Sequence, residues 1–172
     1  MKKLLLLIVV VFASCAAFGQ GAGREHRFEE FAVPVYRGVH AKPNFKSDPG
    51  SIEYRTRIRE GAAGPVTFAG HYALVVFGCG TGCRGGFVVD VRSGKIIDLP
   101  LGGEDNEQLW FDARPKSTLL KTWWIDVKND DKWFEHPMCV RQEYLLTGDR
   151  FKLLDHSRKR GKNENECFPD RN

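Results

Sequence analysis

Short apolar runs separated by turn residues fill the middle and C-terminal parts of the chain. Runs rich in β-branched and aromatic residues, bounded by Gly, Asp, Asn and Ser, are typical of strands joined by tight connections. The pattern predicts a mainly β fold, α+β at the margin, with an antiparallel meander of about seven short strands. The expected strands cover residues 72–77, 87–91, 95–99, 109–112, 119–127, 140–146 and 151–154.

One helix is predicted before the strands begin. Asp48 is suited to the N-cap and Pro49 to the first turn, so the helix is expected from residue 50 to about residue 63. Its apolar positions form a narrow stripe that would pack on the sheet. The stripe consists of Ile52, Tyr54, Ile58 and Ala62.

The N-terminus has the pattern of an export signal. Two lysines precede an apolar run at 4–12, and small residues follow as far as Gly19. The run is too short to span a membrane comfortably, so we predict a signal peptide at 1–19 and a mature chain that begins at Gln20. A less favoured alternative is lipoprotein processing, in which Cys15 would carry a lipid anchor. Either reading places the protein in the periplasm or outside the cell, with no membrane span.

Composition and charge then restrict the class of protein. With 42% hydrophobic and 28% charged residues, the chain is neither disordered nor collagen-like. Residues 20–172 are expected to form a single β-rich domain with an extended arm at 24–46 and a C-terminal tail. The formal charge of +4 falls by two when the signal lysines are removed, so no nucleic-acid partner is expected. The basic run at 158–160 is interpreted as part of a solvated tail.

Four cysteines lie beyond the signal peptide, and export predicts that they form two disulfides. Three pairings are possible. The glycine-rich segment 78–83 can fold tightly, which favours Cys79 with Cys83 and therefore Cys139 with Cys167. Loop-closure entropy gives about 2 kcal/mol for the short bridge and about 3.6 kcal/mol for the long one. The long bridge would tie down the tail, and the short one would shape a loop.

Two other readings of the short cysteine loop are less favoured. Redox motifs usually have two residues between the cysteines, and here there are three. Zinc would need further ligands, and the nearby candidates His71 and His136 stand at no recognised spacing. No cofactor or metal is therefore expected.

Three segments resemble a known family. They are Gly64 to Tyr72 with the letters FAGHY, the segment GCGTGC at 78–83, and Asp90 to Lys95. Together they resemble an uncharacterised family of secreted or periplasmic bacterial proteins. That family has no established activity, so the resemblance implies export and a one-domain organisation and leaves the chemistry open.

Candidate functional residues gather in two places. His71 is the most plausible acid or base, although a structural, hydrogen-bonded histidine is the favoured reading; no G-x-S-x-G turn is present and no carboxylate pair stands out. Near the cysteine loop we expect binding residues at His71, Tyr72, Thr81 and Arg84. Neighbouring strand residues point to opposite faces, so one of Trp123 and Trp124 is a candidate to bind a glycan or protein. The alternative, at least as favoured, is that the helix or the N-terminal arm covers that second face.

These observations predict an exported, disulfide-stabilised binding protein of the bacterial envelope that does not catalyse a reaction. Its partner would be an envelope protein, such as a hydrolase, or a cell-wall glycan. Two alternatives stay open. One is an envelope hydrolase that uses His71 as acid or base, and the other is a structural component anchored by lipid at Cys15.

Overall fold

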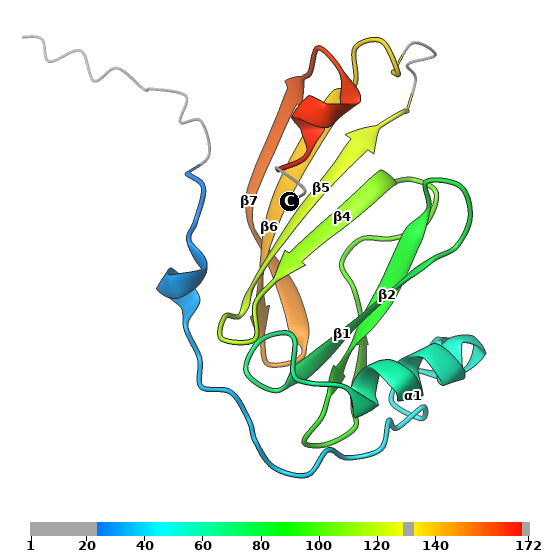
Figure 1. The fold of residues 1–172 in the computed structure, drawn as a ribbon, viewed down its shortest axis with the longest axis vertical. Coiled ribbons are helices and arrows are strands. Elements are labelled where there is room, and N and C mark those ends of the chain that lie inside the picture. The colour runs from blue at the N-terminus through cyan, green and yellow to red at the C-terminus, as the bar shows by residue number, and fades with distance from the viewer. Residues whose placement is uncertain (1–23, 129–132, 170–172) are drawn as a thin grey trace, which may run out of the picture.

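The computed structural model of the protein describes residues 24–128 and 133–169. The predicted signal peptide at 1–19 and Cys15 lie outside the described residues. Within them, seven strands form two antiparallel sheets, and a helix packs on the smaller one (Figure 1). The prediction of a mainly β fold with one helix is therefore confirmed.

The strands follow the chain order within each sheet. The three-stranded sheet has the order β1-β2-β3 and the four-stranded sheet the order β4-β5-β6-β7. The predicted meander thus holds inside each sheet but is divided between β3 and β4, which the strand pattern does not reveal. The bounds are β1 (Tyr72–Gly78), β2 (Arg84–Asp90), β3 (Ile96–Asp98), β4 (Glu107–Ala113), β5 (Leu119–Asp126), β6 (Met138–Thr147) and β7 (Arg150–Arg160).

The two sheets face each other across an apolar core. Val88 of the small sheet and Leu120 of the large sheet are fully buried in it, together with Phe68 from the turn before β1. The opposite face of the small sheet is covered by α1 (Arg55–Ala63), whose Ile58 packs in a cluster with Val75. The helix lies very close to the strand, because a Cβ at Gly61 would lie 2.6 Å from a methyl carbon of Val75.

The helical segment differs from the prediction in its first turns. Residues Pro49–Tyr54 form a 3₁₀ helix, and the α-helix begins only at Arg55. Asp48 caps this start as predicted, since its side chain accepts a hydrogen bond from the Ser51 N–H at 3.2 Å. A 3₁₀ helix has three residues per turn, so Ile52 leaves the predicted stripe and is 52% exposed.

The last strand is longer than predicted. β7 extends to Arg160, so the basic run 158–160 is exposed as predicted but belongs to a strand and not to the tail. The reason is the partner strand: β6 reaches back to Met138, which pairs with Arg160. Propensity along 155–160 is weak, and the neighbouring strand decides the conformation.

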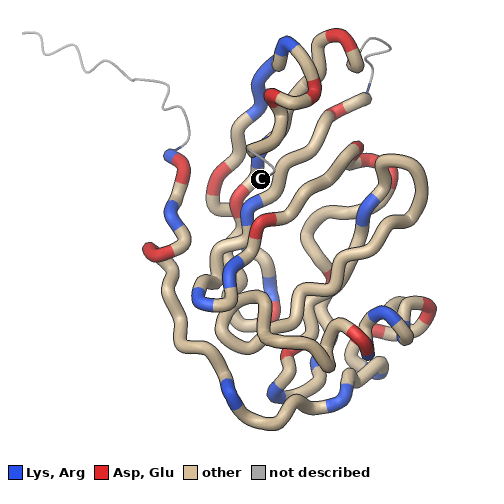
Figure 2. The backbone as a smooth tube through the Cα atoms, viewed as in Figure 1, with Lys and Arg blue, Asp and Glu red and all other residues tan. Residues whose placement is uncertain are grey.

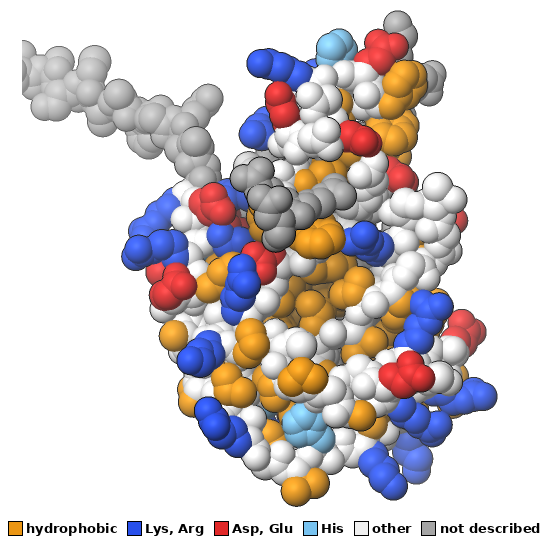
Figure 3. All heavy atoms as spheres, viewed as in Figure 1, with side chains coloured by type: hydrophobic (Ala, Val, Ile, Leu, Met, Phe, Trp, Pro, Cys, Tyr) orange, Lys and Arg blue, Asp and Glu red, His pale blue; other side chains and the backbone are white. Residues whose placement is uncertain are grey.

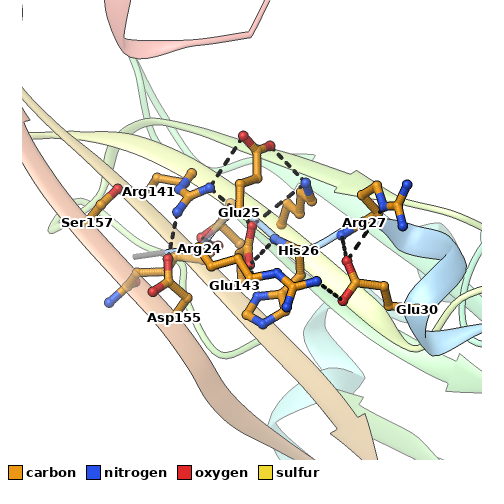
Figure 4. A network of polar contacts seen from close by, with 12 residues as sticks. Arg24, Glu25, His26, Arg27, Glu30, Arg141, Glu143, Asp155 and Ser157 are labelled. Atoms are coloured by element: carbon orange, nitrogen blue, oxygen red, sulfur yellow. Dashed lines mark hydrogen bonds and ion pairs between the residues drawn. The ribbon is translucent and has the colours of Figure 1, made fainter. Parts of the chain in front are cut away.

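The terminal segments cover the outer face of the four-stranded sheet. The N-terminal arm is held by a buried ion network around Glu143, whose side chain is fully buried (Figure 4). Glu143 accepts hydrogen bonds from His26 Nδ1 at 2.7 Å and from an Arg141 Nη atom at 3.2 Å, and Lys121 Nζ lies 3.7 Å away. The C-terminal segment covers the other part of this face.

Both predicted disulfides are present, Cys79 with Cys83 and Cys139 with Cys167. The second joins β6 to the C-terminal segment and is buried against Trp123. Within residues 24–128 and 133–169, no helix is long and apolar enough to cross a membrane. These features are compatible with an exported, disulfide-stabilised protein.

Candidate functional site

A tight turn before β1 presents His71. Ala69 and Gly70 both have positive φ, 47° and 78°, so the chain reverses direction just before Tyr72. This region is unfavourable for Ala, and residues held in such conformations cluster at functional sites. A side chain at Gly70 would place its Cβ 2.5 Å from the carbonyl oxygen of Pro34, so the arm can lie here only against a glycine.

The imidazole of His71 is engaged by Arg92. An Nη atom of Arg92 lies 2.6 Å from Nε2 of His71, and because a guanidinium only donates, Nε2 accepts the bond and carries no proton. Burial lowers the pKa of His71; the carboxylate of Asp90 opposes this shift, and the charge of Arg92 adds to it. His71 is therefore neutral near pH 7, with its Nε2 lone pair occupied.

Asp90 fixes the turn that carries Arg92. One oxygen of Asp90 accepts a hydrogen bond from the Arg92 backbone N–H at 2.9 Å, and the other accepts one from the Ser93 hydroxyl at 2.8 Å. Gly94 completes the turn with a φ of 79°. Both carboxylate oxygens of Asp90 thus bond within the loop. The carboxylate also lies 4.0 Å from His71 Nε2.

These residues line a cleft of about 770 Å³, here named the His71 cleft. Two contacts join lining residues from the two sheets: the Tyr72 hydroxyl donates to the Gly148 carbonyl at 2.9 Å, and Lys95 forms an ion pair with Asp149. The hydrogen bond from Lys95 lowers the pKa of Asp149, and burial raises the pKa of Tyr72. The full lining is 33–36, 69–72, Asp90, Arg92, Lys95, Thr118, Leu146, Gly148 and Asp149.

The cysteine loop forms a separate site. Gly82 has a φ of 70°, and its missing side chain leaves room for the carboxylate of Glu107. The guanidinium of Arg84 lies 5.3 Å from the ring centroid of Trp110, beside a smaller cleft of about 270 Å³. Thr81 is exposed at the tip of the loop. The bridge thus shapes an exposed loop next to a stacked cation.

The two tryptophans of β5 lie on opposite faces, as strand geometry requires. Trp123 is buried beside the Cys139 disulfide. Trp124 is partly buried, and its indole N–H is enclosed without an acceptor among the described residues. The most exposed aromatic side chain in this part of the chain is Phe134, at 61%.

The structure therefore brings together only part of the predicted set. His71 and Tyr72 share the His71 cleft, Thr81 and Arg84 belong to the cysteine loop, and Trp123 and Trp124 belong to the large sheet. Sequence reasoning missed the other polar residues of the cleft. Their turns, Ser93-Gly94 and 147–149, are visible as turns in the sequence, but nothing there shows that they meet. The missed charged residues are Asp90, Arg92, Lys95 and Asp149.

The described residues, 24–128 and 133–169, contain no group of three or more His, Cys, Asp or Glu side chains placed to hold a metal ion. No family model matches the chain, and no curated protein or solved structure matches it either. Function must therefore be argued from the His71 cleft itself.

Proposed function

We propose that this is an exported binding protein of the bacterial envelope, and that it holds a ligand in the His71 cleft without transforming it. The observation that carries the proposal is the cleft, in which the polar groups bond to one another. Its volume of about 770 Å³ lies in the range of ligand-binding sites. The family resemblance and the two disulfides agree with an extracytoplasmic setting.

The state of His71 argues against catalysis. A general base needs a free lone pair within reach of the substrate proton. The Nε2 lone pair of His71 accepts from Arg92, and the nearest carboxylate, Asp90, is bonded to the loop backbone and to Ser93. An envelope hydrolase that uses His71 would first have to break the contact with Arg92. The arrangement suits a rigid binding surface better.

Among the two partner classes considered, the cleft favours a cell-wall glycan over an envelope protein. It is concave, whereas protein interfaces are usually larger and flatter. Tyr36 contributes an aromatic ring to the lining and Leu146 an apolar side chain, and the charged groups of the cleft balance, two basic against two acidic. A ligand that combines sugar rings with short peptide stems presents matching apolar faces, hydroxyls and charges of both signs.

The test is cosedimentation of the oxidised protein with purified cell-wall sacculi. Arg92→Ala removes the cation that positions His71, and we expect it to reduce the bound fraction about tenfold, since a charge-assisted contact is worth 1.5–3 kcal/mol. Lys162→Ala removes an exposed cation after β7 and serves as the matched control, with binding unchanged. Far-UV circular dichroism checks that both variants fold.

Two results would contradict the proposal. If the unmodified protein does not sediment with sacculi, the glycan assignment is wrong. If a panel of ester and cell-wall substrates is turned over and His71→Ala abolishes that turnover in a folded protein, the protein is an enzyme. Capture of an envelope hydrolase through the same cleft would instead support the protein partner.

The N-terminal processing site is tested separately. Mass spectrometry of the exported protein is expected to find Gln20 as the first residue. A lipidated Cys15 as the first residue would support the anchored alternative.

A further inference from the structure

We propose that the free edge of β7 is a docking site for an acidic, extended segment of a partner protein, which adds to the four-stranded sheet as a fifth strand. Such strand addition uses main-chain hydrogen bonds for affinity and neighbouring side chains for selectivity. The site is distinct from the His71 cleft, because no residue from 155 to 160 lines that cleft.

The backbone geometry of β7 leaves hydrogen-bonding groups on its outer side. β7 stands last in the order of its sheet, and no other described strand pairs with its outer edge. The Gly161 N–H donates to the Pro137 carbonyl at 2.8 Å, and the register continues unbroken back to Asp155. Antiparallel pairs alternate, so the groups of Ser157 and Lys159 face β6. Those of His156 and Arg158 face outward.

The edge is strongly basic. Asp155, the one acidic residue of β7, is bound to Arg141 at 2.6 Å on the outer face of the sheet. Asp126 of β5 pairs with Arg158 at 2.6 Å, so one of the five cations of the strand is already offset. Figure 2 shows Lys and Arg in blue at the end of β7 that lies next to the C-terminal 3₁₀ helix (Glu164–Cys167). The basic residues of the strand are Arg150, Lys152, Arg158, Lys159 and Arg160.

This charge selects the kind of partner. A second copy of the chain would bring like charges together along the new ladder, which disfavours pairing between copies. An added strand with carboxylates at alternate positions presents them on one face of the sheet, where they can lie beside Lys159; Arg158, on the other face, is already paired with Asp126. The edge therefore favours an acidic segment of another protein.

The edge of the small sheet provides a contrast. On the outer side of β1, the Leu74 N–H donates to the Thr67 hydroxyl oxygen at 2.7 Å, and the Gly78 carbonyl accepts from Arg57 at 3.4 Å. Side chains thus block both ends of that edge. In β7 most side chains are exposed, and no comparable cap on His156 or Arg158 is found within the described part of the chain.

The test uses a fluorescent peptide of about ten residues that alternates Glu and Thr, with blocked ends, added to the oxidised full chain. Fluorescence anisotropy is expected to show saturable binding. The same peptide with N-methyl groups on alternate amides keeps its charges but cannot pair along one edge, and its affinity should fall about tenfold or more. This comparison does not depend on the folding of any variant.

Two protein variants separate the backbone from the charge. His156→Pro removes an outward N–H, which an edge strand tolerates, and should weaken binding about tenfold. Lys159→Glu should weaken binding about fivefold, while Lys116→Glu, the same single reversal in an exposed turn, should stay within about twofold.

Specific outcomes would overturn the proposal. If the acidic peptide does not bind, the proposal that β7 accepts an added strand is wrong. Equal affinity for the N-methylated and unmodified peptides would show that backbone pairing plays no part. If inorganic polyphosphate and anionic phospholipid vesicles bind as tightly as the peptide, and His156→Pro does not change their affinity, the edge is a general polyanion surface. If Arg92→Ala loses sacculus binding but keeps its affinity for the peptide, the β7 edge and the His71 cleft are independent sites.

Discussion

The two sheets cover their outer faces by different chemistry. The small sheet is covered by α1 through apolar contacts, in which Ile58 is fully buried against Val75. Part of the large sheet is covered by the N-terminal arm through charged side chains centred on Glu143. Figure 3 shows charged groups of both signs on the side of the molecule where the arm begins.

The helix and the arm therefore respond differently to the loss of a side chain. Apolar packing is non-directional, and its loss scales with the area or volume removed. A buried ion network depends on every partner, because a charge left without its counter-ion bears the full desolvation cost. Directional ion pairs therefore fix the arm at one position along the sheet, whereas the helix is held by the fit of apolar side chains. The same arm forms one wall of the His71 cleft.

The largest effect is expected from Glu143→Ala. The change leaves Lys121 and Arg141 partly uncompensated beneath the arm, and should lower the free energy of unfolding by about 3–5 kcal/mol. Urea denaturation at neutral pH measures it. Glu29→Ala, an exposed acid of the same arm, is the control and should change stability by less than about 0.5 kcal/mol. A similar small loss for both would refute the ionic account of the arm.

A smaller effect is expected on the apolar side. Ile58→Val removes one buried methylene between α1 and the small sheet and should cost about 0.5–1.5 kcal/mol. Val39→Ala, at a side chain that is 91% exposed, is the control. The loss at residue 58 should not vary with salt. A strong salt dependence in the denaturation curves would mean that charges also hold the helix.

The smallest effect concerns pH. The hydrogen bond from Lys121 lowers the pKa of Glu25 below its ordinary value of 4.5 in the folded protein. Its contribution is therefore present above that value and is lost as the pH falls through the lower, folded pKa. Because Glu25 is 62% exposed, Glu25→Gln should cost at most about 1 kcal/mol at pH 7 and nothing in strong acid. Thermal melts across this range test it; a difference that grows in acid would contradict the sign.

Local signals in the sequence were enough for much of the fold. The seven strands, the N-cap at Asp48 and the pairing of Cys79 with Cys83 all follow from residues close in the chain. The errors have two sources, one in a distant partner and one in the local helix type. β7 continues to Arg160 because β6 lies beside it, and Ile52 turns outward because the segment starts as a 3₁₀ helix.

The candidate site divides in the same way. The glycines around His71 mark a turn in the sequence, and His71 and Tyr72 could be selected from it. Arg92 and Asp149 could not, because their roles depend on two turns that are 57 residues apart in the chain and meet only in the folded protein.

The sequence by itself determined the β-rich class, the cysteine pairing and the tight turns, because strand periodicity and glycine conformations are properties of neighbouring residues. Only the tertiary structure decided where the meander divides into two sheets, that His71 Nε2 accepts a hydrogen bond from Arg92, and that Glu143 is buried under the arm. Those features depend on the distance and burial of groups far apart in the chain, and local pattern carries no information about either.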